Sequence, residues 1–218
     1  MIDDRVYWDK FYSSKHDEIS NPSSFAKFVF DNFLYDKSGA RLVEFGCGNG
    51  RDSLFFIKNN INVTAIDSSD VSISKLEIFN NKSDTNFICA DFTSDLEIYK
   101  QGFDFCYSRF TLHAINDEQE KALFENIAKM LNKNGLFFIE ARSINDGKFG
   151  HGEAVGKREF ILDGHYRRFI DKNILKNNLE KLGFKIVSLE ESSDFAPKKG
   201  ENCVCLRTIA KISWTLQA

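Results

Sequence analysis

The fold of this chain is decided by one stretch, Leu42-Val43-Glu44-Phe45-Gly46-Cys47-Gly48-Asn49-Gly50-Arg51-Asp52. A short apolar run ends in an acid, and three glycines follow at alternate positions before a helix-compatible segment. Glycine has no Cβ and tolerates positive φ, so such a strand, turn and helix would bring a ligand against bare backbone. The dinucleotide-binding pattern G-x-G-x-x-G does not fit, because Arg51 stands where its third glycine would be. The acid two residues before Gly46 favours a cationic ligand over a pyrophosphate.

This glycine pattern carries a family resemblance. The run Glu-x-Gly-x-Gly-x-Gly from Glu44 to Gly50 resembles motif I of the class I S-adenosylmethionine-dependent methyltransferases, whose ligand carries a sulfonium and an α-ammonium group. The resemblance covers residues 40–140 strongly and the two ends loosely. It implies S-adenosylmethionine as the cofactor, a Rossmann-like fold, and cofactor contacts from Glu44, Gly46, Cys47, Gly48 and Gly50.

Composition limits the class of protein. At 218 residues, with 42% hydrophobic and 28% charged residues, the chain is expected to form one soluble domain spanning residues 1–218. The formal net charge of -3 provides no general attraction to nucleic acid or to an anionic membrane, so neither is expected as a partner. The start of the chain lacks a secretory-signal pattern, and no apolar run is long enough to span a membrane. We therefore expect a cytoplasmic protein that acts on a small molecule, with an oligomeric state that the sequence does not indicate.

The five cysteines are odd in number and scattered through expected strands. We interpret them as reduced core thiols. Cys203-Val204-Cys205 lacks the C-x-x-C spacing of a zinc site, and no metal is expected.

Apolar strands alternating with helices predict an α/β fold. Strands are expected at 41–46, 62–66, 86–90, 103–108 and 135–141, and residues 117–132 carry the apolar stripe of a helix lying on a sheet. Near-continuous apolar strands indicate a mostly parallel sheet covered by helices on both faces. A helix near 171–182 and two β-like runs, 184–189 and 204–212, would complete seven strands with an antiparallel last strand.

Two segments lie outside this scaffold. Residues 1–38 are expected to form an N-terminal helical cap, with Pro22 after Asn21 opening one of its helices. Residues 143–170 contain five glycines and dense charge, and they follow the fifth expected strand. Ligands bind at the carboxyl ends of such strands, so we interpret this insert as a lid that carries the substrate site.

Two acids after strands match cofactor contacts of the family. Asp67 ends the second expected strand, where a carboxylate can accept from both ribose hydroxyls; a helix N-cap is the alternative. Asp91 and Phe92 match the residues that accept from the adenine amino group and flank the base, and a solvated loop acid is the alternative. Asp52 either contacts the ligand or caps a helix. Ser68 and Ser108 complete this set of candidates.

Aromatic residues near the N-terminus are further cofactor candidates. Trp8 and Tyr12 are four residues apart and share a helical face. They resemble the paired aromatics with which thiopurine- and tellurite-type methyltransferases close over the cofactor, with Phe25 as a third wall. The alternative is that they only pack an N-terminal helix against the core.

Histidines and arginines are the candidates for chemistry on the acceptor. The run Tyr107-Ser-Arg-Phe-Thr-Leu-His113 replaces the Asn-Pro-Pro-Tyr typical of methyltransferases that act on DNA or glutamine amino groups. His113 is a candidate general base, although a histidine here also packs or caps a helix in the family. His151 and His165 are further base candidates, with Glu153 and Asp146 as orienting partners.

The substrate candidates are Arg109, Arg142, Tyr166, Arg167 and Arg168. Arginine suits phosphate or carboxylate. Adjacent arginines on an extended segment cannot both face one pocket, so we expect one of Arg167 and Arg168 in the site and the other paired with an acid. A solvated charged loop is the alternative.

These features predict a methyltransferase that acts on an oxygen of a small molecule. A sugar hydroxyl would need a base, whereas an anionic oxygen on a phosphate, phosphoramidate or carboxylate would need only positioning and arginine. The arginines favour an anionic or nucleotide-linked acceptor. The motifs also resemble a bacterial subgroup associated with capsule and surface-polysaccharide modification. The alternatives are transfer to sulfur, tellurite or nitrogen, and a non-catalytic binding module of the same fold.

Overall fold

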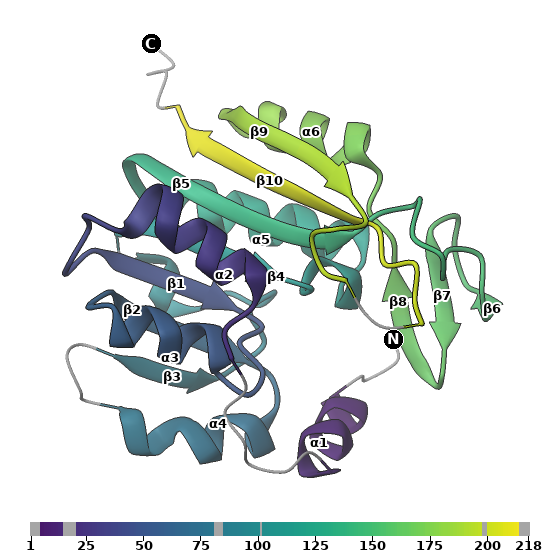
Figure 1. The fold of residues 1–218 in the computed structure, drawn as a ribbon, viewed down its shortest axis with the longest axis horizontal. Coiled ribbons are helices and arrows are strands. Elements are labelled where there is room, and N and C mark those ends of the chain that lie inside the picture. Colours follow the sequence, from purple (N-terminus) through teal and green to yellow (C-terminus); the bar gives the residue numbers. More distant parts are fainter. Residues whose placement is uncertain (1–4, 15–20, 81–84, 101, 198–199, 214–218) are drawn as a thin grey trace.

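A seven-stranded sheet forms the centre of the molecule. The computed structural model describes residues 5–14, 21–80, 85–100, 102–197 and 200–213. The sheet strands are β1 (Arg41–Phe45), β2 (Asn62–Asp67), β3 (Asn86–Cys89), β4 (Phe103–Arg109), β5 (Leu131–Arg142), β9 (Phe184–Ser192) and β10 (Cys205–Ile212). They lie in the order β3-β2-β1-β4-β5-β10-β9 (Figure 1). Strands β1 to β5 pair in parallel, and β10 is antiparallel to both neighbours. The predicted sheet, with its antiparallel last strand, is confirmed.

Helices cover both faces of this sheet (Figure 1). On one face lie α2 (Ser24–Val29), the π-helical turn η1 (Phe30–Leu34) and α3 (Arg51–Lys58), and on the other lie α5 (Asp117–Met130) and α6 (Lys172–Lys181). Shorter elements are α4 (Asp70–Leu76), η2 (Glu77–Phe79), η3 (Glu97–Lys100) and η4 (Leu112–Ala114). One buried cluster joins α5 and α6 to the sheet, and a second joins α2 and α3 to it. The doubly covered sheet explains why its strands are apolar on both sides.

Local capping fixes where the helices begin and end. The α5 helix begins with a capping box in which the Asn116 side chain accepts from the Gln119 backbone and the Gln119 side chain accepts from the Asn116 backbone. It ends at Met130, before the predicted Asn132, because Leu131 adopts extended backbone and begins β5. The α2 helix begins after Ser23, whose hydroxyl accepts from the Ala26 amide, and not at Pro22 as predicted.

The 143–170 insert contains a second sheet. Strands β6 (Glu153–Ala154), β7 (Glu159–Leu162) and β8 (His165–Arg168) pair antiparallel in that order. Asp163 and Gly164 form the two-residue turn between β7 and β8 with φ of 54° and 80°, as a type I′ hairpin requires. The first and last residues of the insert lie side by side, because Ser143 and Ile170 form a parallel bridge. The insert is therefore built around a three-stranded antiparallel sheet that the sequence did not predict, and its role as a lid stays a prediction.

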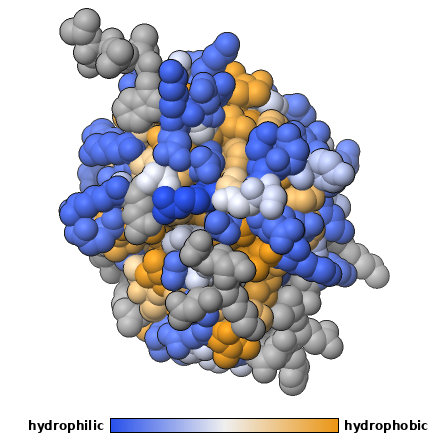
Figure 2. Space-filling view, turned by 90° about the vertical axis from the view of Figure 1, so that its left-hand side faces the viewer, coloured by the Kyte–Doolittle hydropathy of each residue, from blue (hydrophilic) through white to orange (hydrophobic). Residues whose placement is uncertain are grey.

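One end of the molecule gathers segments that are far apart in the sequence. Helix α1 (Arg5–Ser14) lies beside the β7–β8 hairpin, at the side where β1 and β4 end (Figure 1). Tyr7 of α1 stacks on His165 with ring centroids 4.1 Å apart, and Ser69 donates to Asp9. The opposite side of the molecule is covered mainly by hydrophilic side chains, with some apolar patches (Figure 2). Among the helices that the structure describes, none has the length and hydrophobicity to cross a membrane.

Candidate cofactor and acceptor site

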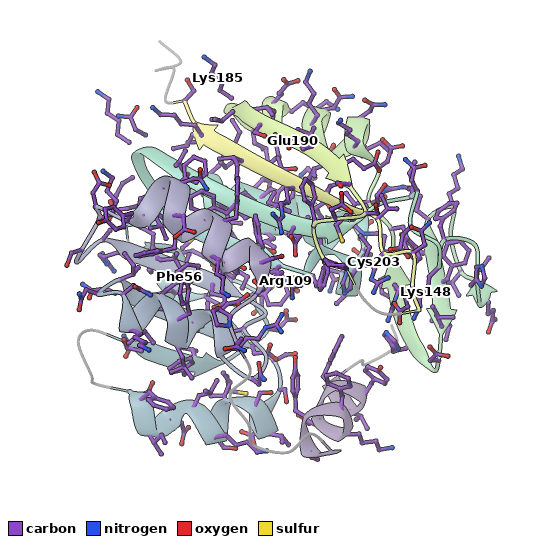
Figure 3. All side chains as sticks on the ribbon, viewed as in Figure 1. Phe56, Arg109, Lys148, Lys185, Glu190 and Cys203 are labelled. Carbon is purple, nitrogen blue, oxygen red and sulfur yellow. The ribbon has the colours of Figure 1, made fainter. Side chains whose placement is uncertain are left out.

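A cavity of about 890 Å³ lies at the carboxyl ends of the sheet strands, between the sheet, α1 and the β7–β8 hairpin. Most of the predicted site residues line it: Trp8, Tyr12, Glu44, Gly46, Cys47, Gly48, Asp52, Asp67, Ser68, Asp91, Phe92, Arg109, His113, Arg142, Tyr166 and Arg167. Its volume is ample for a nucleoside-sized ligand and a small second molecule. Arg109 lies near the centre of this end of the sheet (Figure 3).

The glycine turn after β1 presents bare backbone to the cavity. Gly46 and Gly48 have φ of 71° and 53°, which disfavours any residue with a Cβ. A Cβ at Gly48 would overlap the Tyr12 hydroxyl, and one at Gly46 would lie 2.6 Å from the Thr111 hydroxyl. Only glycine therefore allows α1 and the loop after β4 to approach this turn.

Carboxylates surround the glycine turn. Glu44 is 3% exposed and accepts from the Ser53 hydroxyl, and burial raises its pKa well above the ordinary 4.5. Asp67 accepts from the Gly48 amide at 2.8 Å on one oxygen and from the Ser69 amide at 2.9 Å on the other. Each Asp67 oxygen keeps a lone pair for a further donor. This end of the cavity suits a ligand with hydroxyl and ammonium donors.

Three further predicted residues line the cavity and also make contacts within the protein. Asp91 is exposed and accepts from the Thr93 amide and hydroxyl. Phe92 is buried against Phe45, with ring centroids 6.1 Å apart. Asp52 accepts from the Ser23 amide and hydroxyl, both at 2.7 Å, and from the Tyr107 hydroxyl at 2.9 Å. Asp52 thus fixes the start of α2 while it lines the cavity.

Aromatic rings of α1 cover the glycine turn. Trp8 and Tyr12 stack with centroids 6.1 Å apart and an interplanar angle of 27°. Burial raises the pKa of the Tyr12 hydroxyl above its usual value. Phe25 lies elsewhere, fully buried on Tyr107 beneath α2. The α1 pair thus excludes water from this part of the cavity, and Phe25 forms no third wall.

The other end of the cavity is basic, and two of its three arginines are already paired. Arg109 donates to Glu140 at 2.8 Å, and Glu140 also accepts from Arg207 at 2.6 Å. Arg142 donates to both Asp146 oxygens at 3.1 and 3.0 Å, and to Glu201 at 3.1 Å.

Arg167 is the exception among these arginines. In the part of the chain that the structure describes, it has no carboxylate partner, and its hydrogen-bond contact is the His165 Nε2 atom at 2.8 Å. Its Nε is buried without a partner there. Burial lowers its pKa, and the charge of Arg142 lowers it further. A buried cation in this state favours an anion as its partner.

His113 is buried close to these charges. Its Nδ1 has no hydrogen-bond partner among the described residues, and its ring lies 5.5 Å from the Phe110 ring. Burial lowers its pKa well below 6.5, and the positive charges of Arg167 and Arg142 lower it further. His113 is thus held neutral at physiological pH.

Comparison with known proteins identifies the family of the chain. A family model described as "Methyltransferase domain" matches residues 19–189. The chain belongs to the S-adenosylmethionine-dependent methyltransferases.

Two curated relatives match this methyltransferase over part of their length. "Juvenile hormone acid O-methyltransferase" of Bombyx mori is 28% identical over 171 residues, which cover 72% of the chain and 60% of the relative. "Probable S-adenosyl-L-methionine-dependent methyltransferase TehB" of Haemophilus influenzae is 25% identical over 138 residues, covering 62% and 48%. The chain thus matches 60% and 48% of the length of these two relatives.

A solved structure shares the fold. The Burkholderia thailandensis 1,6-didemethyltoxoflavin-N1-methyltransferase, with bound substrate and S-adenosylhomocysteine, superimposes with a TM-score of 0.69 at 18% identity. The match covers 95% of this chain and 88% of that one.

The cavity fits the cofactor of the family, S-adenosylmethionine. Gly46 and Gly48 present their backbone in the cavity wall. Glu44 and Asp67 would offer acceptors for the ammonium and hydroxyl groups of the cofactor, and Trp8 and Tyr12 would cover it. The described residues include no group of three or more histidine, cysteine or acidic side chains that could hold a metal ion.

Five predicted site residues lie outside the cavity wall: Gly50, Ser108, His151, His165 and Arg168. The backbone of Gly50 caps α3 and packs against Leu76, and Ser108 is fully buried in β4. His151 is an exposed loop residue, whereas His165 stacks on Tyr7 and contacts Arg167.

Arg168 has a structural role in place of the predicted substrate contact. It is fully buried and forms ion pairs with Asp117 and Glu120. Its guanidinium is therefore unavailable to a ligand, while Arg167 lines the cavity. The neighbouring arginines face different partners, as their spacing on a strand requires.

Several functional residues escaped the sequence interpretation. Phe110 and Thr111 line the cavity, but Phe110 has φ of 57°, which no local pattern signalled. Glu159 of β7 also lines it, and the Asp163-Gly164 dipeptide was the available signal for its hairpin. Among the cysteines, all are free and four are buried, but Cys89 is exposed and lines the cavity.

Proposed function

We propose that the chain transfers a methyl group from S-adenosylmethionine to an oxygen of a small anionic molecule. The observation that carries this proposal is Arg167, a partly buried guanidinium in the cavity wall without a carboxylate partner among the described residues. An anionic acceptor would compensate this charge. The activity, the substrate and the acceptor atom of the whole protein all remain part of the proposal.

The lowered pKa of His113 favours an acceptor whose oxygen is already anionic. General bases work best with a pKa near the operating pH. Burial and nearby arginines hold the His113 pKa well below 6.5, so its imidazole is a weak base for a sugar hydroxyl. An anionic oxygen needs no base, because its lone pair is already available to attack.

The residues of the chain then position and desolvate the reactants. When bound, S-adenosylmethionine supplies a methyl group activated by its sulfonium. Arg167 would hold the acceptor anion, and the Phe110 ring would pack against its apolar part. Trp8 and Tyr12 would exclude water. Alignment of this kind supplies much of the rate of a bimolecular reaction.

The relatives support the class of reaction and leave a second candidate. The silkworm relative is named an acid O-methyltransferase, in agreement with an anionic oxygen. The Burkholderia enzyme is named for a nitrogen acceptor, so transfer to nitrogen or sulfur is the second candidate. The resemblance to a capsule-associated bacterial subgroup stays a prediction about the acceptor.

An acceptor screen with labelled S-adenosylmethionine tests the proposal. Carboxylic acids, phosphorylated metabolites, nucleotide sugars, neutral sugars, amines and thiols are compared. We expect transfer to an anionic oxygen, and a loss of about tenfold or more in acceptor kcat/KM on Arg167→Gln, because a charged hydrogen bond is lost. Arg41→Gln, at the opposite end of β1, is the matched control. Transfer only to neutral hydroxyls, amines or thiols would refute the proposal.

A further inference from the structure

We propose that the acceptor site is built for a single negative charge, and that Glu201 and Asp146 set this limit by cancelling the charge of Arg142. The inference rests on the proposed function and refines its substrate class. It predicts that carboxylates and phosphodiesters are accepted, whereas doubly charged phosphate monoesters are rejected.

Both terminal nitrogens of Arg142 are paired with carboxylates. Its Nη1 donates to both oxygens of Asp146, and its Nη2 donates to Glu201. Lys148 also lies 3.2 Å from Glu201. Two cations and two carboxylates therefore form a neutral cluster around a residue that is 8% exposed. Arg142 lines the cavity, and its two carboxylate partners offset part of the attraction that its charge would exert on an anionic ligand.

Backbone contacts hold this neutral cluster in place. Asp146 accepts from the Val204 amide at 3.1 Å and from the Lys148 amide at 2.9 Å. Gly147 donates to the Asn202 carbonyl at 2.8 Å, which ties the segment before Cys203 to the start of the insert. Cys203 lies between the start of β10 and the insert (Figure 3). Asp146 cannot swing away to free Arg142 without breaking these contacts.

Of the arginines at this end of the cavity, Arg167 is the one without a carboxylate partner among the described residues. Arg109 has the carboxylate of Glu140, which it shares with Arg207 outside the cavity wall, and burial lowers the pKa of His113 well below its usual value. Arg167 Nε and His113 Nδ1 are both buried and lack a hydrogen-bond partner in the described parts of the chain. Together they offer an oxyanion two hydrogen-bonding positions and one positive charge.

A second negative charge on the acceptor would be unfavourable. Glu159 of β7, the strand next to β8, adds a further carboxylate to the cavity wall. A carboxylate in the cavity wall repels the acceptor anion, and it repels a dianion more strongly than a monoanion. Carboxylates and phosphodiesters carry one charge, but a phosphate monoester carries two above its second pKa of about 6.

Three small probes separate charge from shape. Acetate and dimethyl phosphate carry one charge, and methyl phosphate carries two at about pH 8. The protein is saturated with S-adenosylhomocysteine, the ionic strength is held constant, and binding is measured from the methyl signals by saturation-transfer NMR. We expect acetate or dimethyl phosphate to bind at least about tenfold more tightly than methyl phosphate, since a charged hydrogen bond is worth that much. The tighter monoanion indicates whether a carboxylate or a phosphodiester is the natural group.

Variants assign the selectivity to named residues. Glu201→Gln keeps an oxygen for Arg142 but removes one charge, so methyl phosphate should gain about tenfold relative to the tighter monoanion. This gain distinguishes control of charge from a merely structural role, which would only weaken binding. Arg167→Gln should abolish binding of both monoanions. Glu190→Gln, an exposed residue on β9 far from the cavity, is the matched control (Figure 3).

The proposal is overturned if methyl phosphate binds wild-type protein as tightly as the tighter of the two monoanions, if Glu201→Gln leaves the ratio of methyl phosphate to that monoanion unchanged, or if no probe binds. Each result contradicts the single-charge site but leaves the proposed methyl transfer standing, because the acceptor screen measures that transfer separately. A failed screen, by contrast, would refute the proposed function whatever the probes do.

Discussion

At the scale of single residues, Glu44 carries a buried carboxylate beside the glycine turn, and it forms no ion pair with the described residues, although the charge of Arg51 lowers its pKa. Its side chain accepts from Ser53, and burial raises its pKa well above 4.5. A charge in this state costs stability in the free protein. The ammonium group of a bound cofactor would compensate the same carboxylate. Glu44 would thus lower the stability of the free protein and raise its affinity for the cofactor.

We predict that Glu44→Gln stabilises the free protein and weakens cofactor binding. Since the folded pKa is raised above the unfolded value of 4.5, the stability that Glu44 contributes is present below pH 4.5 and is lost as pH rises through the folded pKa. Glutamine does not ionise, so the melting temperature of Glu44→Gln should exceed that of the wild-type protein by a margin that widens above pH 4.5. Calorimetric affinity for S-adenosylmethionine should fall about tenfold, as for a lost charged hydrogen bond.

The control for Glu44→Gln is Glu118→Gln, an exposed residue in the first turn of α5. It should change neither the pH dependence nor the affinity. An equal loss of stability at all pH values in Glu44→Gln would show that the carboxylate is structural.

Local patterns predicted the residues around the glycine turn better than the ion pairs at the other end of the cavity. Glu44, Gly46 and Gly48 are adjacent in sequence, and Asp67 follows a strand whose apolar pattern is plain. By contrast, Arg142 and its partner Glu201 are separated by 59 residues. No local pattern encodes which cation meets which acid across such a distance, so the charge balance of the acceptor end needed the structure.

At the scale of elements, the β7–β8 hairpin is fixed at its root by Arg168. The guanidinium donates to the Leu112 carbonyl at 3.3 and 3.0 Å and forms ion pairs with Asp117 and Glu120. Arg158 of the same insert also pairs with Asp117. The hairpin carrying Arg167 is thereby joined to the η4 turn carrying His113, so the two walls of the acceptor end hold their relative positions.

We predict that Arg168→Lys loosens this junction. A lysine cannot donate to the carbonyl and both carboxylates in one geometry. The acceptor KM should rise about tenfold, because buried charged hydrogen bonds are lost. Affinity for S-adenosylhomocysteine should stay unchanged, and amide exchange at 159–168 should accelerate.

Arg158→Lys removes a more exposed contact to the same Asp117 and is the matched control for Arg168→Lys. Its effect on acceptor KM should be small. If Arg168→Lys instead weakens the cofactor and leaves acceptor KM at the wild-type value, the hairpin does not position the acceptor.

The strands of the insert were not predicted from the sequence. The five glycines between 143 and 170 led to the interpretation as a lid, which stays a prediction, and Gly152 and Gly164 have positive φ of 89° and 80° next to the strands. The Asp163-Gly164 turn between Phe160-Ile161-Leu162 and His165-Tyr166 was the stronger local signal. Glycine content alone did not separate a tight turn from a flexible segment.

At the scale of the whole molecule, the cavity is closed by segments from distant parts of the chain. The sheet supplies the glycine turn and the acids, α1 supplies Trp8 and Tyr12, and the insert supplies Tyr166 and Arg167. Contact between Tyr7 and His165 joins the two covering segments. An acidic end and a basic end therefore share one cavity, which would suit transfer of a methyl group between two ligands.

The atom that receives the methyl group tests this account most directly. The protein is incubated with S-adenosylmethionine labelled with carbon-13 in its methyl group, together with the acceptor found in the screen, and the product is examined by NMR. The account predicts a methyl carbon bonded to oxygen of a carboxylate or singly charged phosphate group, with the signal strongly reduced in Arg167→Gln. A methyl carbon bonded to nitrogen or sulfur, or one bonded to a neutral hydroxyl oxygen, would contradict it.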